Sequence, residues 1–207
     1  MSDIIWRVKN FVEEECKKPG SKYGYEPFGN HFIPAIKYAE ELIKFFSKDE
    51  EGIRSSPKKI ANIKDDNQDR EVILIAVWLH DIGSIIYGRK DHNITGAKIA
   101  EEKLKEFGLL LEKIKLVKEC ILNHRGSQQN RRKTIEEKIV AEADTLSNFD
   151  NLPGIFKAAY IYENKTQDEA RKSVREKPER KYKQVHFKES KELIKPKIEA
   201  VRLLLGG

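Results

Sequence analysis

The stretch VILIAVWLHDIG, residues 72–83, contains the longest apolar run of the chain and ends in an adjacent histidine and aspartate. Its β-branched residues would also suit a strand, but no partner strand is apparent elsewhere, so we predict a central helix buried on nearly all sides. This helix would deliver His80 and Asp81 at its C-terminal end, with Gly83 ending it. Burying an ionisable pair is costly unless something satisfies it, and a metal ion would satisfy both residues at once.

Apolar residues recur at helical spacing on both sides of this stretch. They predict helices over residues 4–18, 30–46, 94–107, 110–124, 135–146, 148–163 and 187–205. The intervening segments are a loop over 20–30, a polar surface connection over 47–69 and a charged stretch over 164–186. Pro34 is tolerated only because it falls in the first turn of its helix, which puts His31 at the helix N-terminus. The predicted fold class is all-α.

Composition and charge limit the functional classes. The chain has 207 residues, of which 39% are hydrophobic and 36% charged, typical of one ordinary domain with lysine- and glutamate-coated helices. Residues 1–156 carry 26 basic and 26 acidic side chains, whereas residues 157–207 carry 14 and 8, so the net charge of +6 belongs to the C-terminal part. We expect this excess to coat solvated helix faces rather than to bind nucleic acid.

Cysteine usage and the apolar runs indicate the compartment. Cys16 and Cys120 match no CxxC pattern, which indicates neither a disulfide framework nor a thiolate metal site. The N-terminus does not read as a signal peptide, and the longest apolar run is far shorter than the ~20 residues of a membrane span. We therefore expect a soluble, cytoplasmic protein that does not insert into membranes, and the sequence leaves a homo-oligomer open.

Four of the five histidines stand at predicted helix ends or on an apolar stripe: His31, His80, His92 and His124. His124 lies three residues past Ile121 on the same helical stripe, so its imidazole should face the interior or a cleft. A single such histidine is more often a hydrogen-bonded core residue than a ligand. His80 and Asp81 could converge on one ion beyond the helix end, with His31 and Asp144 as further ligands by type and placement.

Five segments together resemble the HD superfamily of metal-dependent phosphohydrolases: GNHF (29–32), WLHDIG (78–83), DHNITGAKIAEEKL (91–104), ILNHRGS (121–127) and AEADTLSNFD (141–150). The resemblance covers roughly residues 28–150. It implies a compact multi-helix HD-domain bundle over 1–156, including the N-terminal helix, with a C-terminal helical extension over 157–207 packed on the same domain.

The resemblance also implies the ligands of the metal. A first ion would be bound by His31, His80, Asp81 and Asp144. His92 and His124 correspond to histidines that hold a second ion in bimetallic members, with Asp81 as the bridge. Close relatives often have two consecutive histidines where this chain has His92-Asn93, and ADAD at residues 141–144, where this chain has AEAD. Whether one or two ions are bound is left open.

The predicted chemistry is phosphate hydrolysis. Imidazole and carboxylate ligands suit Mn²⁺, Fe²⁺, Co²⁺, Ni²⁺ or Zn²⁺, and Mg²⁺ is a further candidate for the bound ion. Such an ion activates a water molecule for in-line attack at phosphorus, and Asp81 is the candidate to orient that water. Arg89, Lys90 and Arg125 flank the proposed ligands and are the candidate phosphate-binding residues.

The leading hypothesis is a phosphohydrolase that acts on a nucleotide or another small phosphorylated metabolite. No motif identifies the substrate, although the absence of a GYP tripeptide after His124 disfavours the HD-GYP subgroup, which acts on cyclic dinucleotides. The alternative is a non-catalytic HD-fold module that binds nucleotides or nucleic acid. Four intact ligand positions favour the enzyme.

Overall fold

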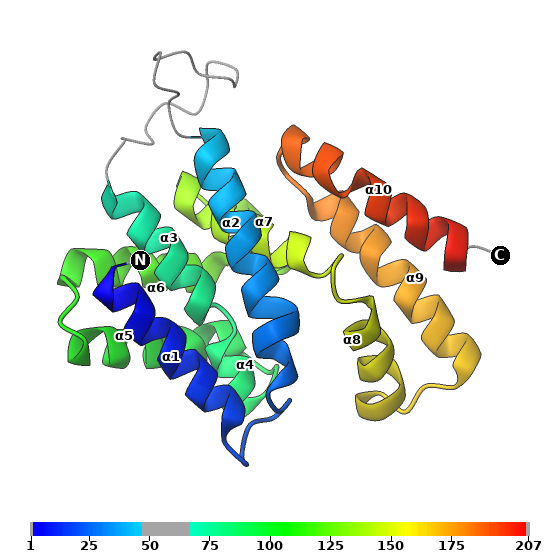
Figure 1. Ribbon diagram of the computed structural model, residues 1–207, viewed down its shortest axis with the longest axis horizontal. Coiled ribbons are helices and arrows are strands. Elements are labelled where there is room, and N and C mark those ends of the chain that lie inside the picture. The colour runs from blue at the N-terminus through cyan, green and yellow to red at the C-terminus, as the bar shows by residue number, and fades with distance from the viewer. Residues whose placement is uncertain (1, 47–66, 206–207) are drawn as a thin grey trace.

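The computed structural model describes residues 2–46 and 67–205, and all regular elements within these ranges are helical (Figure 1). They are α1 (Asp3–Lys17), the π-helical turn η1 (Phe28–Phe32), α2 (Ile33–Phe46), α3 (Asn67–Leu79), α4 (Ile82–Tyr87), α5 (His92–Glu106), α6 (Leu111–Asn123), the 3-10 turn η2 (Gly126–Arg131), α7 (Ile135–Ser147), α8 (Leu152–Lys157), the π-helical turn η3 (Ala158–Tyr162), α9 (Gln167–Gln184) and α10 (Lys188–Leu205). The predicted all-α class is confirmed. Of the polar connection predicted over 47–69, residues 47–66 lie outside the described ranges, and the last three belong to α3.

Helix α3 is the centre of the bundle, as its apolar sequence predicts. It packs against α1, α2, α6 and α7, and residues 72–79 are all at most 3% exposed. Trp78 stacks on Phe28 and Phe32 with ring centroids 5.6 and 6.4 Å apart. Each large side chain buried in this way contributes roughly 1.5 to 3 kcal/mol. The end of α3, and with it His80, is therefore held firmly in the core.

Gly83 does not end this helix, contrary to the prediction. Helix α3 stops at Leu79, His80 and Asp81 form a turn, and Gly83 lies inside α4. A Cβ at Gly83 would come within 2.3 Å of the His92 carbonyl oxygen and 2.6 Å of the Gly96 nitrogen. Glycine is required here because α4 and α5 approach each other backbone to backbone.

The segment before α2 is more helical than the sequence predicts. Helical structure starts at Glu26, within the expected loop, and runs through η1 directly into α2. The Ile33 N–H closes the π turn by donating to the Phe28 carbonyl oxygen, and Pro34, which has no N–H to donate, follows directly. His31 thus lies in a π turn within a longer helical run rather than at a helix N-terminus.

The C-terminal part differs most from the prediction. The charged stretch 164–186 contains α9, an 18-residue helix that begins with a capping box of Thr166 and Glu169. Only Ala170, Val174 and Pro178 of α9 are buried, a stripe of one residue per turn that a periodicity search does not detect among so many charges. The helix predicted over 148–163 is divided into α8 and η3, and α10 agrees with the prediction for 187–205. Helices α9 and α10 lie side by side (Figure 1).

Among the described residues, no single helix has both the length and the apolar character to cross a bilayer. One pair of helical segments, Arg70–Tyr87 and His92–Glu106, meets those criteria jointly but is bent by 113°.

Candidate metal centre

Six side chains from five parts of the fold meet at the end of α3. His80 and Asp81 form the turn between α3 and α4, and the others come from η1, the start of α5, the residue after α6 and the last turns of α7: His31, His92, His124 and Asp144. These are all the predicted metal-binding positions, and the structure brings them together.

The first cluster consists of His31, His80, Asp81 and Asp144. The Nε2 atoms of His31 and His80 are 2.9 Å apart. Asp81 Oδ2 lies 3.5 and 3.8 Å from these two nitrogens, and Asp144 Oδ1 lies 3.6 and 3.8 Å from them. Donor atoms that share one ion at about 2.1 Å stand about 3 to 4 Å apart, so this donor set fits a divalent ion.

The second cluster shares Asp81 with the first. Asp81 Oδ1 lies 3.2 Å from His92 Nε2 and 3.7 Å from His124 Nε2, and the two nitrogens are 3.3 Å apart. Asp81 therefore directs one carboxylate oxygen at each cluster, an arrangement suited to a bridging carboxylate between two ions.

Hydrogen bonds at the opposite ring nitrogen fix how three of these imidazoles face the site. The Nδ1 atoms of His80, His92 and His124 lie 2.7, 2.8 and 2.6 Å from the backbone carbonyl oxygens three residues earlier. A carbonyl oxygen can only accept, so each Nδ1 carries a proton and donates it. In the neutral ring this leaves Nε2 unprotonated and directed at the cluster.

His31 has the same tautomer through a different partner. Its Nδ1 lies 2.9 Å from Ser147 Oγ, and the Ser147 hydroxyl donates to the Asp144 carbonyl oxygen at 2.8 Å. The hydroxyl has one proton to donate, so it accepts from His31 Nδ1. Four unprotonated Nε2 atoms and two carboxylates thus converge, and their lone pairs repel each other unless a cation lies between them. The residues present fit a divalent metal ion.

The protonation states also suit metal binding. Burial lowers the pKa of His80 to about 4, and burial also lowers the pKa of His92, so both rings are neutral near pH 7. Burial alone would raise the pKa of Asp144, but Lys181 and the neighbouring imidazoles of His80, His31 and His124 together outweigh it, so the pKa falls below the ordinary value. Asp144 is therefore an ionised carboxylate.

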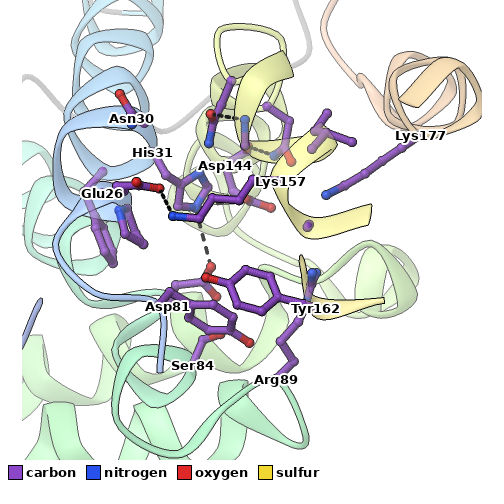
Figure 2. Close-up of a pocket in the computed structure, with 18 of the residues that line it drawn as sticks. Glu26, Asn30, His31, Asp81, Ser84, Arg89, Asp144, Lys157, Tyr162 and Lys177 are labelled. Atoms are coloured by element: carbon purple, nitrogen blue, oxygen red, sulfur yellow. Dashed lines mark hydrogen bonds and ion pairs between the residues drawn. The ribbon is translucent and has the colours of Figure 1, made fainter. Parts of the chain in front are cut away.

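The clusters open into a cavity of about 750 Å³ (Figure 2). Of the three candidate phosphate-binding residues, Arg89 and Arg125 line this cavity, whereas Lys90 is exposed and is not among the lining residues. Arg125 Nη1 also donates to Asn93 Oδ1 at 3.4 Å.

Sequence reasoning missed further side chains that line the cavity or contact the clusters. Lys177 and Lys181 of α9 line the cavity, as does Lys157 of α8, and Lys181 Nζ lies 3.2 Å from Asp144 Oδ2. The two α9 lysines are four residues apart and so share one helix face, a signal concealed within a stretch interpreted as solvated charge. Ser147, which orients His31, follows Asp144 by three residues and lies within the segment AEADTLSNFD.

Comparison with known proteins finds one matching family and one relative. Residues 49–148 match the HD domain family, a range that includes both clusters except His31, which the fold supplies from outside it. Over 134 residues the chain is 33% identical to a protein of Erythrobacter litoralis (strain HTCC2594) named bifunctional uridylyltransferase/uridylyl-removing enzyme. That alignment covers 59% of this chain and only 14% of the relative. No solved structure matches the chain.

Proposed function

We propose that this chain, of which residues 49–148 match the HD domain family, is a metal-dependent phosphohydrolase that cleaves a phosphoester or phosphoanhydride bond of a nucleotide or another small phosphorylated metabolite. The proposal rests on the position of Asp81. One of its carboxylate oxygens lies beside the first cluster of unprotonated imidazole nitrogens, and the other lies beside the second. Such a donor set has little use in a binding module that holds no metal.

In this proposal His31, His80, Asp81 and Asp144 hold one divalent ion, and Asp81, His92 and His124 are the candidate ligands of a second. A divalent ion supplies Lewis acidity, which lowers the pKa of water and withdraws electron density from a phosphoryl oxygen. Asp81 orients the attacking water. The water oxygen forms the new bond to phosphorus and gives up a proton, the bond from phosphorus to the leaving oxygen breaks, and the leaving oxygen takes up a proton, so that one water molecule is consumed for each bond cleaved.

The other residues of the cavity would bind and position the substrate. Arg89 and Arg125 are suited to contact phosphate oxygens because a guanidinium can donate two parallel hydrogen bonds. Tyr23 and Tyr162 line the same cavity with their rings in edge-to-face contact, 5.5 Å between centroids, which offers an aromatic surface to a base. A volume of about 750 Å³ is within the range of small-molecule sites.

A nucleotide substrate has limited support beyond this geometry. The name of the Erythrobacter relative includes a uridylyl-removing activity, and a uridylyl group is a nucleotide. We further propose that residues 157–207 pack on the HD domain of residues 1–156 as part of the same unit, because Lys177 and Lys181 reach its cavity. A cytoplasmic location and the absence of nucleic-acid binding remain predictions.

The experiment that tests the proposal combines metal analysis with a substrate panel. The purified protein is expected to contain a transition metal and to release phosphate, or a nucleoside phosphate, from at least one nucleotide in the presence of Mn²⁺. The His80→Ala variant should lose both properties, and His186→Ala, which changes an exposed histidine outside the cavity, should keep both. A protein that binds nucleotides and metal but hydrolyses none would be the non-catalytic module instead.

A further inference from the structure

Two cations in the cavity have no anionic partner. Among the described residues, no carboxylate lies within ion-pair distance of Arg89 or Lys177, although Glu163 lines the same cavity and pairs with Lys165. Figure 2 shows Lys177 reaching in from α9 and Arg89 reaching toward the same space from the segment after α4. Arg89 is exposed, whereas Lys177 is partly buried, and a partly buried cation without a counter-charge is costly. The position of Lys177 beside a second cation therefore indicates a site for an anion.

The cations also lie close enough to repel one another. Burial, followed by the charges of Arg89 and Lys181, lowers the pKa of Lys177 to about 8. Gathering three cations around one space destabilises the free protein, and an anion bound between them would relieve that repulsion. We expect this anion to be a phosphate group, because the same cavity contains the proposed phosphohydrolase centre.

The position of Lys177 separates this anion from the one at the metal centre. Lys181 contacts Asp144, a proposed metal ligand, at 3.2 Å. Lys177 precedes it by four residues on the same face of α9, which is about 6 Å along the helix axis. A phosphate bound to Lys177 would therefore lie further from the metal than one bound beside Lys181. The offset between the two lysines suits two different phosphate groups of one phosphate chain.

We propose that Arg89 and Lys177 bind a second phosphate of the substrate, so that the substrate carries a chain of two or more phosphates. This inference rests on the proposed function and narrows its substrates to compounds with a chain of phosphates. Monophosphates are expected to be poorer substrates. The shared chemistry is the phosphate chain, which a nucleoside triphosphate and inorganic tripolyphosphate both contain. The tyrosines at the cavity wall favour the nucleoside form.

Binding measured by calorimetry tests the second phosphate site without relying on catalysis. The protein is used as purified, with no metal added, and its metal content is measured before and after titration to detect stripping by the ligand. Wild-type protein should bind tripolyphosphate at least about tenfold more tightly than orthophosphate, because the second phosphate gains hydrogen bonds to the charged groups of Arg89 and Lys177. The double variant Arg89→Gln/Lys177→Met should lose this preference.

Lys172→Met is the matched control, since Lys172 is an exposed lysine of the same helix that pairs with Glu176. It should bind tripolyphosphate as the wild type does. Equal affinity of the wild type for the two anions, or unchanged tripolyphosphate affinity in the double variant, would overturn the proposal. Comparing a nucleoside triphosphate with tripolyphosphate then identifies the source of the chain, since only the nucleoside form gains from contact with the tyrosines.

Kinetics separates this inference from the proposed function. The double variant should reduce kcat/KM for a nucleoside triphosphate at least about tenfold more than for the corresponding monophosphate. An equal reduction for both would indicate a general electrostatic effect and contradict a second phosphate site. If the wild type hydrolyses neither a nucleotide nor another small phosphorylated metabolite, the proposed function fails, and the calorimetric comparison still decides whether the anion site exists.

Discussion

Ser147 Oγ accepts a hydrogen bond from His31 Nδ1 at 2.9 Å and links the end of α7 to a histidine 116 residues earlier in the sequence. Ser147 is fully buried and also donates to the Asp144 carbonyl oxygen. One hydroxyl therefore sets the tautomer of one proposed ligand while fixing the backbone of another. His31 is the proposed ligand whose Nδ1 has a side-chain partner, whereas the other three use backbone carbonyls.

Replacing Ser147 with alanine should weaken metal binding without removing any ligand. Loss of a hydrogen bond that orients a metal-binding histidine typically costs 10- to 100-fold in affinity, and we expect roughly that decrease. Competition with a fluorescent chelator measures it. Thr145→Ala deletes a buried hydroxyl from the same helix outside the cavity and should leave affinity unchanged. Equal effects of the two substitutions would show that the loss reflects packing and not the His31 hydrogen bond.

The metal stoichiometry should depend on which cluster is altered. If two ions are bound, His92→Ala should remove one and retain the other, whereas Asp81→Ala should remove both because its oxygens serve both clusters. Elemental analysis of the purified variants measures this. Hydrolysis should fall by about 100-fold or more in Asp81→Ala, since a metal supplies several kcal/mol of transition-state stabilisation. Full metal content in Asp81→Ala would contradict the proposed centre.

Much of this centre could be predicted from the sequence because its strongest signals are local. The apolar run before His80 determines a buried helix, and the dipeptide at its end has few ways to satisfy its charge. The apolar stripe of its helix predicts that His124 faces inward, and in the structure its side chain is 3% exposed at the second cluster. These inferences need only helical periodicity and the cost of burying a charge.

The parts that could not be predicted depend on contacts between distant segments. Nothing in the sequence around Lys177 or Lys181 shows that α9 turns its charged face toward the metal centre, because exposed and cavity-lining lysines look alike in a charged helix. The sequence predicts a helix end at Gly83 because glycine commonly terminates helices, whereas in the structure Gly83 allows the backbone of α5 to approach α4 closely. In both cases a rule based on neighbouring residues was applied where a contact between distant segments decides the role of the residue.

A methyl group at Gly83 should displace the second cluster. In Gly83→Ala the new Cβ would lie 2.3 Å from the His92 carbonyl oxygen, so α5 must shift together with His92. We expect a loss of stability of roughly 1 to 3 kcal/mol, typical of overpacking, and weaker binding of any second ion. Urea denaturation and metal analysis test both. Gly29→Ala, where a Cβ meets nothing within 4 Å, should change neither.

Glu142 should stabilise the C-terminal helices rather than bind metal. This carboxylate is 1% exposed and accepts hydrogen bonds from the backbone N–H groups of His186 and Phe187, at the turn between α9 and α10. Glu142→Ala would leave buried donors unpaired and should lower the free energy of unfolding by roughly 2 to 4 kcal/mol. Glu142→Gln keeps one acceptor and should cost less. Metal content should remain normal in Glu142→Gln, and its loss there would place Glu142 in the centre.

Lys177 should react with amine-directed reagents at a lower pH than an ordinary lysine. Its pKa of about 8 lies well below the ordinary value near 10.4, so about half of its side chains are neutral and nucleophilic at pH 8. The ordinary residue is then less than about 1% neutral. Acetylation with a water-soluble ester, followed by mass spectrometry of the peptides, gives the rate at each lysine as pH is raised from 6 to 10.

The shape of this pH profile distinguishes a lowered pKa from simple accessibility. Restricted access reduces the rate at Lys177 by the same factor at every pH, whereas a pKa near 8 makes the rate level off above pH 8 to 9. Lys172 on the exposed face of α9 provides the reference rate. Tripolyphosphate should protect Lys177 and leave Lys172 reactive, because an anion between Lys177 and Arg89 favours the protonated amine and blocks the approach of the reagent. A Lys177 rate that still rises tenfold per pH unit up to pH 10 would show that burial and the neighbouring cations do not lower the pKa of Lys177.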